Sequence, residues 1–301
     1  MASYIWEFFG YRANDTSHNA VQAFQAGQCP ILKGDCEKRF NNGVTSGVCT
    51  IKPIKSGPVI CCPVRLYSEN YKILRDVTHQ AFGPGFDLLP GREARSHAKK
   101  TGRPCVAVFG QRWGGELRLP QKSGRGSYFV DWVLAKLDGT GSLEEFVAVE
   151  VQSIDTTGSY RKGFDALSNG RTDEKTGAGL NWENVNKRIL PQLIYKGQVL
   201  QRESLCKKGL FFVCPQPVYQ RIMDRLGGQA GLVTYALQPA SITFMVYSHS
   251  SDQAPQTGGV IPLTHDATHS TTVYKVQEAF NNVTLPAADV YKAAIENALD
   301  G

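Results

Sequence analysis

Two apolar segments that each carry an acidic side chain constrain the fold of this chain more than any other feature. Residues 128–134 (YFVDWVL) and 146–154 (FVAVEVQSI) have the composition of buried strands, and the turn-forming residues 138–142 (DGTGS) lie between them. Charged groups are rare on buried strands unless they are paired or bind a metal. We therefore predict a hairpin that brings Asp131 and Glu150 to one site.

The residue types around this hairpin are those that bind Mg²⁺. Alternate strand residues face the same side, so Glu150 and Gln152 should point together. We expect Asp131 and Glu150 to be metal ligands, with the Val151 carbonyl completing the shell and Gln152 orienting a water or a phosphate oxygen. Glu116 is a candidate outer carboxylate. Carboxylate-bound cations activate water for phosphodiester hydrolysis, which indicates a nuclease.

The alternative interpretation is that Asp131 ends a strand in solvent while Glu150 and Gln152 line a wet sheet face. The short pattern alone leaves this open. The apolar neighbours Val147 and Val149 favour the site, because a solvated strand is rarely so apolar.

A cluster of cysteines precedes the hairpin. Five of the eight fall within 34 residues of one another, namely Cys29, Cys36, Cys49, Cys61 and Cys62. In a reducing compartment such a cluster indicates metal ligands before disulfides, and four thiolates favour tetrahedral zinc or a single iron. The spacing lacks the paired CxxC of zinc ribbons, so simple burial of some thiols is the alternative. The scattered cysteines are interpreted as packing residues, namely Cys105, Cys206 and Cys214.

Composition sets broad limits. The 301 residues are 42% hydrophobic, which suffices for one large domain or two unequal ones. Lys and Arg number 33 against 27 Asp and Glu, and this net charge of +6 is compatible with a polyanionic partner. The sequence contains no apolar run of membrane-spanning length and no secretory signal pattern, so we expect a cytosolic protein.

The order of expected elements indicates an α/β fold with a mixed central β-sheet flanked by helices. We divide the chain into residues 1–85, an N-terminal region with a four-cysteine metal site, and residues 86–301, a catalytic domain with DNA-contacting loops. Helices are expected near 16–24, 64–82, 182–200 (bent at Pro191), 217–226 and 286–299, strands at 105–109, 210–214 and 241–247, and long loops at 155–180 and 249–270.

Asp, a hairpin and then Glu-x-Gln resembles the PD-(D/E)xK nuclease core, with Gln152 where lysine is usual. Combined with the upstream cysteines, the pattern resembles the NotI-type restriction endonucleases, and its length is similar to the shorter, EagI-like members. The residues that carry the resemblance are Cys29-Pro, Cys36, Cys49, Cys62-Pro-Val-Arg-Leu-Tyr, Glu116, Tyr128 to Asp131 and Glu150-Val-Gln152.

The resemblance implies a bacterial, cytoplasmic type II restriction endonuclease. It implies a homodimer that cuts both strands of a GC-rich palindrome with a GGCC centre, expected to be CGGCCG, with Mg²⁺ as the catalytic metal. It also implies one structural iron, with zinc as the alternative metal. The iron ligands carried over are Cys29, Cys36, Cys49 and Cys62, with Cys61 as the alternative to Cys62.

Basic residues near the hairpin are candidates for DNA contact, because arginine commonly binds guanine edges or phosphates. Those after it are Arg161, Lys162 and Arg171, and those before it are Arg118, Lys122 and Arg125. Two other functions stay open: a non-catalytic DNA-binding regulator with a metal finger, and a structure-specific DNA repair nuclease.

Overall fold

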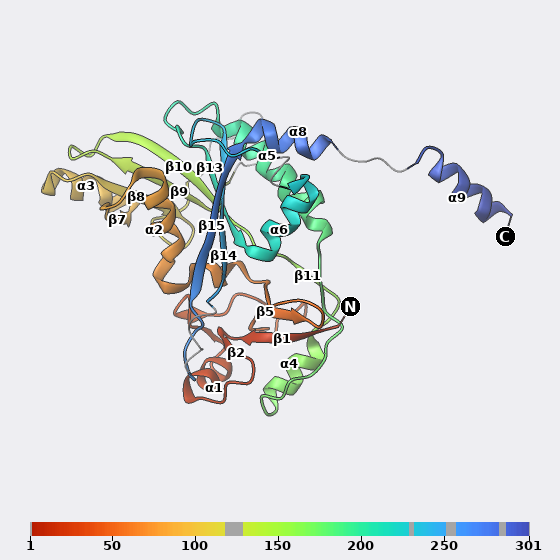
Figure 1. Cartoon of the computed structure of the whole chain (residues 1–301). Coiled ribbons are helices and arrows are strands. Elements are labelled where there is room, and N and C mark those ends of the chain that lie inside the picture. The colour runs from red at the N-terminus through yellow and green to blue at the C-terminus, as the bar shows by residue number, and fades with distance from the viewer. Residues whose placement is uncertain (1, 118–128, 229–231, 251–256, 283–286, 301) are drawn as a thin grey trace.

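A seven-stranded mixed sheet forms the centre of the protein (Figure 1), as seen in a computed structural model that describes residues 2–117, 129–228, 232–250, 257–282 and 287–300. In spatial order its strands are β15 (Leu263–Thr272), β14 (Ser241–His249), β13 (Leu210–Pro215), β10 (Leu143–Val151), β9 (Trp132–Leu137), β8 (Cys105–Gly110) and β7 (Leu88–Pro90). The pairs β10–β13, β13–β14 and β7–β8 are parallel, and the other pairs are antiparallel. The expected α/β fold with a mixed central sheet is confirmed.

Helices cover both faces of this sheet. They are α2 (Ser68–Phe82), α3 (Gly91–Thr101), α5 (Leu190–Leu200), α6 (Gln216–Arg225) and α8 (Val273–Asn281). Phe244 of β14 packs against Tyr219 of α6, whereas Tyr247 donates a hydrogen bond to Asp76 of α2. Even and odd residues of a strand face opposite sides, so α5 and α6 lie on one face and α2 on the other. No helix in the described ranges is long and apolar enough to cross a membrane.

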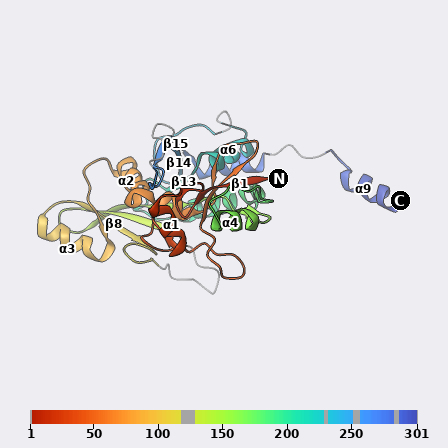
Figure 2. The same ribbon diagram turned by 90° about the horizontal axis from the view of Figure 1, so that it is seen from below.

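The N-terminal region forms a second, smaller sheet, which the sequence did not predict. Its strands, in spatial order, are β2 (Tyr11–Arg12), β1 (Ser3–Phe8), β5 (Val48–Pro53) and β6 (Val59–Ile60). Around it lie α1 (His18–Gln25), β3 (Gln28–Cys29), β4 (Gly34–Asp35) and the short 3-10 helix η1 (Pro63–Tyr67). Figure 1 places this sheet beneath the central one, and Figure 2 views it from below. One continuous apolar core joins the two sheets, and the division at residue 85 stays a prediction.

Most expected helices and strands are present. Ser17 caps α1, since its Oγ accepts a hydrogen bond from Ala20 N. The helix expected over 182–200 consists of a π-helical turn, η2 (Val185–Ile189), followed by α5. Residues 183–200 are helical without a break, so Pro191 lies inside a continuous helix, directly after this π-helical turn. Irregular turns of this kind accompany prolines within helices, and the bend expected at Pro191 stays a prediction.

Three expectations were wrong. The loop expected at 155–180 contains β11 (Thr156–Thr157), α4 (Arg161–Ser168) and β12 (Gly179–Leu180). The second half of the described part of the loop expected at 249–270 belongs to β15, an edge strand whose exposed residues give it a polar composition. The last expected helix, predicted over 286–299, is present as α9 (Val290–Leu299), but its Ala-rich sequence does not pack against the core, since none of its residues is buried.

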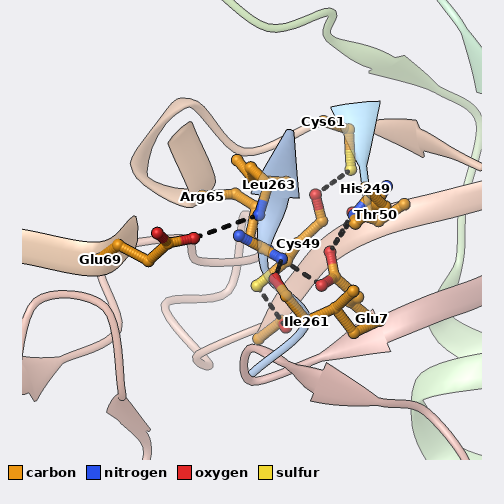
Figure 3. A network of polar contacts seen from close by, with 10 residues as sticks. Glu7, Cys49, Thr50, Cys61, Arg65, Glu69, His249, Ile261 and Leu263 are labelled. Carbon is orange, nitrogen blue, oxygen red and sulfur yellow. Dashed lines mark hydrogen bonds and ion pairs between the residues drawn. The ribbon is translucent and has the colours of Figure 1, made fainter. Parts of the chain in front are cut away.

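A buried ionic network connects the two sheets (Figure 3). Glu7 of β1 and Arg65 of η1 are both fully buried, with 2.9 Å between Glu7 Oε1 and Arg65 Nε. Glu7 Oε2 lies 2.9 Å from His249 Nε2 at the end of β14 and also accepts a hydrogen bond from Thr50 of β5. Arg65 in turn donates to the Ile261 carbonyl. The network thus connects the beginning of the chain to residues near its end.

The electrostatics of this network favour an ionised Glu7. Burial alone would raise the pKa of this carboxyl group. The Arg65 guanidinium and the hydrogen bonds from His249 and Thr50 outweigh that effect and lower the pKa of Glu7 to about 2. Glu7 therefore stabilises the folded state only while it is charged.

Replacing Glu7→Gln should destabilise the protein by about 3–5 kcal/mol, because it leaves the buried Arg65 charge without its partner. Thermal or urea unfolding with circular dichroism measures this change. The double variant Glu7→Gln/Arg65→Met should recover much of the loss, since it removes both charges. A double variant less stable than the single one would contradict this explanation.

The same contribution should depend on pH. A carboxyl group whose pKa is lowered from 4.5 to about 2 on folding stabilises the protein fully above pH 4.5 and loses this effect as the pH falls toward 2. The stability difference between wild type and Glu7→Gln should therefore be constant from pH 5 upward and shrink in acid. A difference that persists unchanged at about pH 2 would show that charge is not its cause.

Candidate active site and cysteine cavity

The register of the β9–β10 hairpin sets the position of the two acidic side chains. Val149 pairs with Trp132, so the next residues, Glu150 and Asp131, come to lie opposite one another where β9 begins and β10 ends. Directly opposed side chains on antiparallel strands have Cβ atoms about 5 Å apart. Asp131 Oδ2 also accepts a hydrogen bond from Val151 N at 2.8 Å. The structure thus brings together the side chains of Asp131 and Glu150 and the backbone of Val151.

The two carboxyl groups strongly perturb one another. Burial raises the pKa of Glu150 to about 7, and the neighbouring Asp131 carboxylate adds to this rise. Burial also raises the pKa of Asp131, although the hydrogen bond from Val151 N opposes it. Glu150 is buried and Asp131 is exposed, and two neighbouring carboxyl groups that resist ionising together are electrostatically suited to a cation, because a bound cation relieves their repulsion.

A lysine that the sequence analysis did not single out also reaches this site. Lys196 of α5 forms an ion pair with Glu150 Oε1, and the two side chains are only 19% and 10% exposed. Its charge favours the ionised forms of both Glu150 and Asp131. The residues between Gln152 and Lys196 contain no spacing signal, so only the fold reveals this contact.

The other two predicted catalytic residues are placed differently. Gln152 follows β10 directly, and its Nε2 donates to the Ser153 carbonyl at 3.2 Å. Glu116 is exposed and lies just before the undescribed residues 118–128. Within the described part of the chain, Glu116 has no hydrogen bond or ion pair with Asp131 or Glu150.

Four of the clustered cysteines line one small cavity in the N-terminal region: Cys29, Cys36, Cys49 and Cys62. All of them are buried. Cys61 is not among the lining residues. Its Sγ instead lies 3.5 Å from the Cys49 carbonyl oxygen and 3.3 Å from Lys38 Nζ. Cys62 therefore lines the cavity, whereas Cys61, its neighbour in the sequence, does not.

Positive charge adjoins this cavity. Arg65 and Lys38 both line it, and Arg65 Nη1 is buried without a hydrogen-bond partner in the described residues. Burial raises the pKa of the Cys49 thiol, and the neighbouring Cys62 adds to the rise. As the side chains stand, no three His, Cys, Asp or Glu residues of the described ranges form a metal-binding cluster. The donors and their charge environment nevertheless fit a thiolate-bound metal, provided the thiols draw together around it.

An ion pair connects the cysteine region to the catalytic hairpin. Arg112, in the segment after β8, forms two hydrogen bonds with Glu37, the residue that follows Cys36. The Arg112 guanidinium also lies over the Tyr67 ring and lowers the pKa of Asp131, although burial of Asp131 outweighs this effect. Arg112 thus contacts the cysteine region directly and acts on Asp131 through its charge.

The basic residues predicted to contact DNA differ in their surroundings. Arg161 and Lys162 begin α4, and the Arg161 guanidinium lies 4.2 Å from the centre of the Phe40 ring. Arg171 is buried and donates hydrogen bonds to the carbonyls of Ala13 and Ala20. It therefore holds α1 in place and is not free to reach a base. The remaining candidates lie outside the described residues, namely Arg118, Lys122 and Arg125.

Comparison with known proteins identifies the class. The chain matches the family model described as restriction endonuclease NotI over residues 20–226, which is more than half of its length. The chain therefore belongs to the NotI restriction endonuclease family. It is a type II restriction endonuclease, an enzyme that cuts DNA at a specific site. No curated protein matches it individually.

Proposed function

We propose that this endonuclease hydrolyses DNA with Mg²⁺ bound by Asp131, Glu150 and the Val151 carbonyl, on a PD-(D/E)xK-type core. The observation that carries the proposal is the Asp131–Glu150 pair, whose carboxyl groups share a hydrogen bond. Glu150 is buried and Asp131 is exposed, and burial together with the neighbouring Asp131 raises the pKa of Glu150 to about 7. Two acids held this close repel one another, and a divalent cation bound between them would offset that repulsion.

The roles of the residues follow from their positions. Bound Mg²⁺ supplies an activated water and offsets charge on the phosphate. Asp131 is held for this task by the Val151 N–H, and Glu150 is held by Lys196. Gln152 would turn from the Ser153 carbonyl to orient the water or a phosphate oxygen. Glu116, on the exposed segment before the hairpin, would approach as an outer carboxylate once DNA is bound.

We further propose a homodimer that recognises a GC-rich palindrome with a GGCC centre, in the form CGGCCG. A two-fold protein matches a two-fold site, and each subunit then cuts one strand. Arg161 and Lys162 are proposed as DNA contacts in the described part of the chain, with Arg118 and Arg125 beyond it. The net charge of +6 supports a polyanionic partner.

For the cysteine cavity we propose one structural iron, with zinc as the alternative metal, bound by Cys29, Cys36, Cys49 and Cys62. Two features support it: the four thiols line one cavity, and the cations Arg65 and Lys38 adjoin it. Four thiolates on a divalent metal carry a net negative charge, which Lys38 would partly offset, whereas the charge of Arg65 is already paired with Glu7. The metal would brace the region that Arg112 connects to the catalytic hairpin.

A plasmid digest tests the proposed function directly. The purified protein is incubated with plasmids that carry or lack CGGCCG, with Mg²⁺ or with EDTA. Discrete fragments that require both Mg²⁺ and the site are expected. Cutting restricted to junctions or flaps would indicate a repair nuclease, and binding without scission would indicate a regulator. Either result would overturn the proposal.

Asp131→Asn and Glu150→Gln should each lower the cleavage rate by roughly 100- to 1,000-fold or more, because they remove the charge that holds the cation. DNA binding, measured by fluorescence anisotropy in Ca²⁺-free buffer, should remain. Glu144→Gln is the matched control, since Glu144 lies on the same strand but is 43% exposed and pairs with Lys136. Wild-type cleavage by either active-site variant would refute the assignment.

Cys36→Ser should lower both the bound metal and the melting temperature, since a structural metal contributes directly to folding. Metal content is measured by inductively coupled plasma mass spectrometry. Cys61→Ser is the matched control and should retain metal, because Cys61 lies outside the cavity lining. Wild-type protein purified without any transition metal would refute the site, and metal loss in Cys61→Ser alone would reassign the fourth ligand.

A further inference from the structure

The active-site strand lacks a positively charged residue at a position that faces the carboxylates. Gln152 is neutral, and its amide is directed to the Ser153 carbonyl. Phosphodiester hydrolysis accumulates negative charge in the transition state, beside two carboxylates that are already negative. A positively charged side chain near Glu150 would therefore stabilise this transition state, and Gln152 does not provide one.

We propose that Lys196 of α5 supplies this charge and is a positioning residue for Glu150. The assignment rests on the metal-dependent hydrolysis proposed above. Lys196 Nζ contacts Glu150 Oε1, which leaves the other carboxylate oxygen free to face Asp131 and the metal. The lysine thus reaches the same carboxylates from a helix instead of from the strand that bears Glu150.

The burial of this ion pair distinguishes it from the surface pairs of the same region. Lys196 is 19% exposed and Glu150 10%, whereas both members of the nearby pair Lys187–Glu183 are 72% exposed. Exposed pairs hold their geometry weakly and are screened by water, but a shielded pair keeps a defined orientation. The pair formed by Lys196 is suited to fixing a catalytic carboxylate.

The fold also holds Lys196 in place. Its aliphatic stem lines an apolar cavity beside the hairpin, together with Val133, Phe146 and Val199. The adjacent Gly197 lets α5 approach α8 closely, since a Cβ there would lie 2.9 Å from Val273 Cγ2. This packing of α5 and the ion pair together hold the ammonium group beside Glu150.

The other cation near the hairpin is already engaged. Arg112 is bound by two hydrogen bonds to Glu37, so its charge is largely neutralised within its own pair. Among the described residues, Lys196 is the cation that forms an ion pair with one of the proposed catalytic carboxylates, Glu150.

The test removes the lysine from α5 and introduces a lysine at position 152, directly after β10. Lys196→Met should lower the single-turnover cleavage rate at saturating DNA and Mg²⁺ by roughly 100-fold, with DNA affinity little changed. Lys196→Arg should recover part of the rate. The double variant Gln152→Lys/Lys196→Met, which places a lysine directly after β10, should cleave at least about tenfold faster than Lys196→Met. A role in packing alone would not respond to a lysine at position 152.

Controls separate this inference from the function on which it rests. Lys187→Met removes an exposed lysine of the same region and should cleave like wild type. Melting temperatures establish folding, and Lys196→Gln replaces Lys196→Met if the latter is unfolded. Wild-type protein that fails to cut DNA would overturn the proposed function. With active wild type, either an unaffected Lys196→Met or a loss that neither arginine nor the relocated lysine recovers would overturn the role of Lys196.

Discussion

The pairing of β9 with β10 is the constraint on which the catalytic chemistry depends. A shift of one residue in this register would turn one acidic side chain to the opposite face of the sheet. The apolar residues of both strands prevent the shift, because Trp132 and Leu134 must remain buried on the α2 side. Packing on one face of the sheet thereby fixes the position of charges on the other.

The sequence predicted this hairpin well because its signals are local. Two apolar runs separated by a turn can form few other structures, and the acid positions then follow from alternation. The capping of α1 by Ser17 is local in the same way. By contrast, β15 has exposed Thr, His and Asp residues typical of a loop, and it becomes a strand only because β14 offers it an edge.

The residues that the sequence did not reveal act over long separations. Lys196 meets Glu150 through the packing of α5 on the sheet, and no motif spacing encodes that contact. Arg171 looked like a free loop arginine, yet its partners are carbonyls more than 150 residues away. The small N-terminal sheet was missed because β2 and β6 are only two residues long and its buried charges, Glu7 and Arg65, resemble surface residues in the sequence.

The ionic network of Figure 3 has a consequence for the order in which the protein can form. Glu7 contacts His249, and Arg65 donates a hydrogen bond to the Ile261 carbonyl. The two charges therefore gain their full set of contacts only after residues 249–261 have been made. During synthesis the N-terminal residues emerge first but must wait for segments made near the end. A nascent or truncated chain ending before residue 249 could form the Glu7–Arg65 ion pair but would lack the contacts of this pair with His249 and the Ile261 carbonyl. The complete network that joins the two sheets is thus deferred until residues 249–261 have been synthesised.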